Sequence, residues 1–155
     1  MKQTSGIKIV AKNRRARHEY HILETFEAGL ALKGTEIKSI RAHRVSLKRG
    51  YVQPRGNELW LVDVHIAEYE QGNRENHDPI RPRKLLLHRR EIDKIIEALN
   101  QKGLTCVPTM MYLKNGRAKV EIALARGKKL HDKRQDMARR DSQRQVERAL
   151  REKYR

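Results

Sequence analysis

The last thirty residues of this 155-residue chain, 126–155, limit how it can fold, because they offer almost nothing to a hydrophobic core. They hold twelve Lys or Arg and five Asp or Glu, a surplus of seven positive charges. So few apolar groups cannot offset the roughly 1–2 kcal/mol per residue that ordering a backbone costs. The segment lacks proline, however, and is rich in good helix formers. We therefore expect a basic C-terminal tail that is disordered or helical and orders against a polyanion such as RNA.

Positive charge is also concentrated at the other end of the chain. Residues 1–18 carry six Lys or Arg and no acid, so of the formal charge of +17 only +4 belongs to 19–125. We expect three parts: a basic arm, 1–18, that partly joins the domain; a folded RNA-binding domain, 19–125; and the tail, 126–155. Two basic extensions on a nearly balanced body indicate two contacts with nucleic acid.

Several protein classes are excluded by composition. No stretch approaches the ~20 apolar residues that a membrane-spanning helix needs, and the N-terminus lacks a secretory signal. Cys106 is the single cysteine, so no internal disulfide is possible, and a reducing cytoplasm fits best. We expect Cys106 to be a small buried residue and not a nucleophile.

Short strands with turn signals dominate the pattern. Strands are expected at 19–26 and from Leu30, and a hairpin joins 51–53 to 58–66. A second hairpin is expected around Asn115-Gly116, a tight-turn signal between 105–113 and 118–125. Residues 35–40 fit either a short helix or a strand. Trp60 lies in a strand with apolar residues on both faces, and we interpret it as core.

One helix has a clear apolar face, formed by Ile92, Ile95, Ile96 and Leu99. Gly103 is expected to end it in a left-handed conformation, and a polar loop, 71–84, precedes it. The fold class is therefore mainly β: a small antiparallel barrel of the oligonucleotide-binding (OB) type, closed or nearly closed, with one or more short helices.

Motifs for catalysis and metal binding are missing from the sequence. It has no Walker loop, H-E-x-x-H or G-x-S-x-G. His18 and His21 would point to opposite faces of a strand, and His77-Asp78 lacks a second ligand cluster. We expect no enzyme activity, cofactor or metal, although two apposed His, or His and Lys, would suffice for a metal-free ribonuclease.

Five stretches carry a resemblance to a known family: NRRARHEY at 13–20, FEAGLALKGTEIKSIR at 26–41, ELWLVDVHI at 58–66, GNRENHDPIRPRKLLLHRREI at 72–92 and GRAKVEIALARGKKLHDKR at 116–134. In these the chain resembles the SsrA-binding protein (small protein B) family, the bacterial partners of transfer-messenger RNA (tmRNA). The match covers most of the chain in family order, and only the segment after Arg134 is generic.

The resemblance implies a non-enzymatic, cytoplasmic and monomeric adaptor for trans-translation. Its barrel would grip the tRNA-like domain of tmRNA, and its tail would become a helix in the empty mRNA channel and decoding centre of a stalled ribosome. Alanyl-tmRNA would arrive with elongation factor Tu. The alternatives are a general RNA-binding or ribosome-assembly barrel and, third, a ribonuclease.

The resemblance also implies two sets of site residues. The tmRNA-binding set is Asn13, Arg15, His18, Tyr20, Glu27, Lys84, Leu85, Leu86 and Leu87. In it, Glu27 would accept hydrogen bonds from bases or riboses, or only orient a nearby arginine, and which of the three leucines is core stays open. The ribosome-binding set is Gly127, Lys128, Lys129, His131, Asp132, Lys133 and Arg134, whose cations would pair with phosphates while His131 stacks on a base. Beyond it, Val146, Leu150 and Tyr154 would form a weak apolar stripe.

Overall fold

The computed structural model describes residues 6–71 and 76–153, and within α4 the side chains of residues 130–132 fall outside the description. Tyr154, the last member of the expected apolar stripe, also lies outside the described residues. In chain order the elements are β1 (Ile7–Lys12), α1 (Arg14–Glu19), β2 (Tyr20–Leu30), α2 (Gly34–Arg41), β3 (Val45–Ser46), β4 (Tyr51–Arg55), β5 (Glu58–Val62), β6 (His65–Ile66), β7 (Arg83–Leu86), α3 (Arg89–Leu99), β8 (Leu104–Lys114), β9 (Arg117–Gly127) and α4 (Leu130–Lys153).

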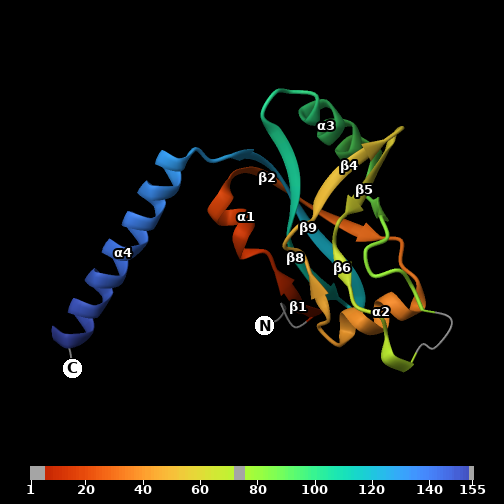
Figure 1. The fold of residues 1–155 in the computed structure, drawn as a ribbon, viewed down its shortest axis with the longest axis horizontal. Helices are drawn as coiled ribbons and strands as arrows, with labels where there is room; N and C mark the ends of the chain where they lie inside the picture. Colours follow the sequence, from red (N-terminus) through yellow and green to blue (C-terminus); the bar gives the residue numbers. More distant parts are fainter. Residues whose placement is uncertain (1–5, 72–75, 154–155) are drawn as a thin grey trace.

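A seven-stranded antiparallel sheet, in the order β1-β8-β9-β2-β7-β5-β4, forms the body of the molecule. The sheet curls so that its edge strand β4 contacts β8 (Figure 1). No ladder joins β4 to β8 within the described residues, so the barrel is not strictly closed. The mainly β, OB-like architecture expected from the sequence is confirmed in this nearly closed form.

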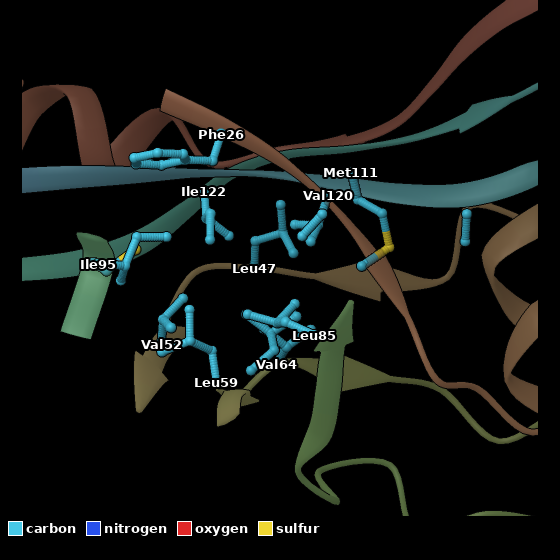
Figure 2. Close-up of a cluster of buried hydrophobic side chains, with 14 of the residues drawn as sticks. Phe26, Leu47, Val52, Leu59, Val64, Leu85, Ile95, Met111, Val120 and Ile122 are labelled. Carbon is cyan, nitrogen blue, oxygen red and sulfur yellow. The ribbon is translucent and has the colours of Figure 1, made fainter. Parts of the chain in front are cut away.

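The core fills the inside of the curled sheet (Figure 2). It draws on strands far apart in sequence, including Phe26, Leu59 and Ile122. The predicted helix is confirmed as α3, which buries Ile92 and Ile95 and packs Ile96 and Leu99 against the same cluster. Cys106 is fully buried, as expected, and burial raises the pKa of its thiol to about 12.

The β8–β9 hairpin is confirmed by its turn. Asn115 and Gly116 both have positive φ, 52° and 80°, as a two-residue turn of type I′ requires. Val120 and Ile122 point inward and are fully buried. Gly103 has a φ of 85°, in the expected left-handed region, but it lies in the turn before β8, because α3 ends at Leu99.

Four expectations were wrong in detail. Residues 19–26 and the residues from Leu30 do not belong to two strands, because β2 runs unbroken from Tyr20 to Leu30. Residues 58–66 do not form one strand, since Asp63 has a φ of 59° and the chain turns there into β6, which pairs with β3. The end of the basic arm is a helix, α1, that includes His18, and β2 begins only at Tyr20. The polar loop is shorter than 71–84, because β7 begins at Arg83. Residues 35–40 are helical, within α2.

A buried ion pair joins α2 to β7. Arg83 Nε lies 2.6 Å from Glu36 Oε2, and neither side chain is exposed to solvent. Arg83 also donates to the carbonyls of Val64 and Pro79, at 2.7 Å and 3.1 Å. Burial alone would raise the pKa of Glu36, but hydrogen bonds from Arg81, the Lys33 amide and Arg83 together lower it below its ordinary value. Arg81 and Arg83, at the end of the 71–84 segment, are therefore structural.

Candidate nucleic-acid interface

Helix α1 is held in place by Asn13, the residue before it. The Asn13 side chain accepts from the Ala16 amide at 3.2 Å and donates to the carbonyls of Leu47 and Pro108 at 3.2 Å and 2.9 Å. It is 7% exposed, so its polar atoms are engaged inside the protein. Asn13, expected among the RNA contacts, thus positions its neighbours and has little surface to offer a ligand.

Helix α1 covers the outer face of the sheet, the face turned away from the core. Ala16 and Tyr20 pack there against Val107 and Ala125, a second small apolar cluster. Arg15 projects from the helix with half its side chain exposed and lies 2.8 Å from Glu19. The hydrogen bond from Arg15 holds the pKa of Glu19 below its ordinary value. Helix α1 therefore holds exposed cations such as Arg15 in fixed positions on the sheet.

A groove of about 470 Å³ runs beside α1. Three expected residues, Asn13, Arg15 and Tyr20, line it, and so do Lys48 and Arg49 from the loop before β4. Sequence reasoning missed Lys48 and Arg49, whose only signal was two adjacent cations before Gly50. Because His18 is in α1, the argument that His18 and His21 point to opposite faces of one strand no longer applies; His18 is partly exposed.

Glu27 lies near the other end of β2, on the outer face. It accepts a hydrogen bond from the Tyr112 hydroxyl and has Lys114 Nζ at 3.4 Å. The Tyr112 hydrogen bond and this lysine lower the pKa of Glu27, although partial burial opposes them. Its side chain is 40% exposed. Glu27 is thus an ionised acceptor held by a tyrosine and a lysine, with no arginine among these partners.

The Lys84–Leu87 segment alternates between the two faces of β7. Leu85 is fully buried in the core, whereas Leu86 is 51% exposed on the outer face. Leu87 is partly buried against the core. Lys84 is 42% exposed, with its ammonium 3.9 Å from Glu58. Leu86 is therefore the leucine that a ligand can reach.

Two groups of expected residues emerge along β2. Tyr20 begins the strand, beside Arg15 and His18, whereas Glu27 lies seven residues on and Gly29 pairs with Leu86. At about 3.3 Å per residue the two groups are roughly 23 Å apart along the strand. The surface they define is long and follows the outer face of the sheet.

The tail leaves the body at Gly127, the last residue of β9. The Lys128 amide donates to the Glu19 carbonyl at 2.7 Å, and its ammonium donates to the Arg17 carbonyl at 3.1 Å and pairs with Asp136. Only 9% of the Lys128 side chain is exposed. The hydrogen bond from Lys128 holds the pKa of Asp136 below its ordinary value. Lys128 therefore forms the joint between α1 and α4.

Helix α4 projects away from the sheet (Figure 1). Its 24 residues extend about 36 Å. Three of its apolar side chains, Met137, Val146 and Leu150, are each at least 50% exposed. Of the expected tail contacts, Lys129 and Arg134 are exposed and Lys133 is partly exposed. The side chains of His131 and Asp132 lie outside the described residues.

Comparison with known proteins identifies the family. The family model described as SmpB protein matches residues 10–152. The chain belongs to the SmpB family. Its relatives include the SsrA-binding protein of Carboxydothermus hydrogenoformans, 56% identical over 147 residues, which are 95% of this chain and 99% of the relative. The SsrA-binding protein of Roseiflexus castenholzii is 58% identical over 157 residues, 100% of this chain and 99% of the relative.

A solved SmpB structure shares the fold. It is described as "tmRNA-SmpB: a journey to the center of the bacterial ribosome" and is 47% identical, with a TM-score of 0.68. The match covers 84% of this chain and 93% of the solved chain. SmpB proteins are RNA-binding adaptors, and in this member both the outer face and α4 present exposed cations.

Two further observations describe this SmpB chain. Within residues 6–71 and 76–153, no three His, Cys, Asp or Glu side chains gather closely enough to hold a metal ion. In the same ranges, no helix has the length and apolar character needed to cross a membrane. The long helix α4, in particular, is strongly polar.

Proposed function

We propose that this chain is the tmRNA-binding adaptor of trans-translation, bringing tmRNA to stalled ribosomes. The single observation that carries the proposal is membership of the SmpB family over residues 10–152. Relatives that match nearly the whole chain are named SsrA-binding proteins, and the related solved structure is of tmRNA-SmpB and the bacterial ribosome.

In this proposal the head, 19–125 with the arm 1–18, binds the tRNA-like domain of tmRNA. Arg15, His18 and Tyr20 would contact RNA at one end of the outer face, and Glu27, Lys84 and Leu86 at the other. Asn13 would act by holding α1, and Leu85 and Leu87 by supporting β7. The length of this interface, roughly 23 Å between the two groups, suits a folded RNA better than a short single strand.

The tail, 126–155, would occupy the mRNA channel and decoding centre of the ribosome. Lys129, Lys133 and Arg134 would contact ribosomal phosphates, with His131 and Asp132 beside them, while Gly127 and Lys128 would set the exit angle of the helix. A helix with charge on most sides and only a weak apolar stripe matches a channel walled by RNA.

The remaining parts of the proposal concern partners and setting. The protein would act in the cytoplasm as a monomer, without catalytic activity, and would meet alanyl-tmRNA together with elongation factor Tu. A single buried cysteine accords with a reducing compartment.

Removal of residues 134–155 tests the division of labour. The truncated protein should bind the tRNA-like domain within about twofold of the full chain, because the contacts that anchor the tail to the body, at Lys128, lie mostly outside the removed segment, and should lose tagging of nascent chains. The matched control replaces Arg15 and Lys84 with Gln in the full chain, which should weaken RNA binding. If truncation lowers RNA affinity as much as tagging, the division is wrong.

A competition assay at ~0.15 M salt separates this proposal from a general RNA-binding barrel. The tRNA-like domain of tmRNA should displace labelled tmRNA far better than an unrelated hairpin of equal length. Equal competition by the two RNAs would refute the specific adaptor and support the general binder.

A further inference from the structure

Trp60 lies on the outer face of the sheet and not in the core. The sequence interpretation that placed it in the core was wrong, because β5 buries Leu59 and Leu61 fully and turns Trp60 the other way. Trp60 is partly exposed and stands outside the core cluster of the described residues. A large aromatic ring is therefore available at the surface.

The surroundings of Trp60 are cationic. The Arg55 guanidinium lies over the ring at 5.6 Å from its centroid, and Lys84 is directly opposite Trp60 on β7. Within the described part of the chain, Arg55 has no carboxylate within 4 Å and bonds only Gln53, at 3.0 Å. The nearby Glu58 is shared between Lys84 and Arg89. The ring thus has beside it a cation that no acid neutralises.

A second ring follows on the same face. Tyr51 pairs with Val62, and Gln53 pairs with Trp60, so Tyr51 and Trp60 occupy diagonal positions on β4 and β5. Diagonal neighbours are about 7–8 Å apart. Tyr51 is 36% exposed and also lines the groove beside α1. The two rings therefore connect the Lys84 end of the interface with the groove.

We propose that Trp60, with Arg55 and Lys84 beside it, is a stacking platform for an unpaired nucleobase of bound RNA. Every base has a π-face, so a ring of this kind binds bases with little sequence preference, and flanking cations hold the adjoining phosphates. Arg55 would leave the ring for a phosphate when the base stacks. The inference rests on the proposed RNA-binding function and adds a contact on the β4–β5 hairpin that the expected site residues do not include.

Trp60 is the chain's single tryptophan, so its fluorescence reports on the platform directly. Full-length protein is titrated with the tRNA-like domain of tmRNA and, separately, with isolated small ribosomal subunits. Saturable quenching by either RNA supports the platform, and the RNA that quenches identifies the source of the base. Absence of quenching by both, at concentrations where binding is complete, overturns it.

Affinity measurements complete the test. Trp60→Leu should weaken binding of the quenching RNA roughly 10- to 100-fold, whereas Trp60→Phe, which keeps a ring, should stay within about threefold. Tyr69→Leu is the control, since Tyr69 forms a similar cation–π pair with Lys38 elsewhere on the molecule. Arg55→Gln should reduce the salt slope of log K by about 0.7–0.9.

The platform can fail without the adaptor function failing. If Trp60→Leu binds as tightly as wild type while its circular dichroism is unchanged, the ring only supports the hairpin and the inference is refuted. If instead the wild-type protein binds the tRNA-like domain of tmRNA no better than an unrelated hairpin, the proposed function itself is wrong.

Discussion

Replacing Arg83 with Met should destabilise the protein by about 4 kcal/mol. Arg83 is fully buried and bonds Glu36 at 2.6 Å, and its removal leaves that carboxylate buried with Arg81 as its remaining cation. Breaking a buried ion pair by removing one partner costs about 3–5 kcal/mol. Arg81 moderates the loss, but the Val64 carbonyl loses its donor, at about 1–3 kcal/mol for an unsatisfied group, whereas the Pro79 carbonyl keeps the Ile66 amide at 2.9 Å.

Urea denaturation at pH 7, followed by Trp60 fluorescence, measures this loss in the head without interference from α4. A loss of about 4 kcal/mol should lower the melting temperature by roughly 8–16 °C for a chain of this size. Arg44→Met is the matched control, because Arg44 pairs with Glu70 at 3.5 Å on the surface, where such pairs contribute about 0–1 kcal/mol. If the two variants lose similar amounts, the reasoning about burial is refuted.

Three further predictions concern the same head. The difference in unfolding free energy between wild type and Glu36→Gln should be full at pH 7 and should shrink as the pH falls below the ordinary pKa of a glutamate. The reason is that the pKa of Glu36 is lowered in the folded state, so protonation in acid removes the stability that the ionised carboxylate contributes. Urea titrations from pH 7 to 3 check this, and a difference that grows in acid would contradict it. Asn13→Ala should cost about 1–3 kcal/mol by thermal melting, since it removes a helix cap and two buried hydrogen bonds; an unchanged melting temperature would exclude that anchoring role. Gly50→Ala should cost about 1–3 kcal/mol, because its new Cβ would lie 2.5 Å from Val64 Cγ2 and 2.9 Å from Pro108 Cγ, and a neutral result in urea would show that this packing can relax.

The fold was predictable where local signals are strong. Asn115-Gly116 has one favoured conformation between two strands, and the spacing of Ile92, Ile95, Ile96 and Leu99 fits only a helix. The break at Asp63 was not predictable, because apolar residues continue through 64–66 and only the tertiary pairing of β6 with β3 separates them. Helix α1 was missed because its single buried residue, Ala16, gives no periodicity.

The site was less predictable than the fold. The family resemblance supplied Asn13 and Leu85 as candidates. A sequence motif, however, does not distinguish a residue that contacts a ligand from one that positions the contacting residue. The core placement of Trp60 failed for a related reason, since both faces of its strand carry apolar residues. Lys48 and Arg49 gave too weak a signal, because adjacent cations are common in a chain with 36 Lys and Arg.

The connection at Lys128 between the sheet and α4 bears on how the sequences of such chains can diverge. Met137, Val146 and Leu150 are each at least half exposed and belong to no core cluster of the described residues, so replacements at these positions should change the free energy of the barrel little. Natural selection on the sequence of α4 can then depend only on how well the helix fits an external surface. Lys128 and the carbonyls of Arg17 and Glu19 are the exception, because a change there alters the direction in which α4 leaves the body.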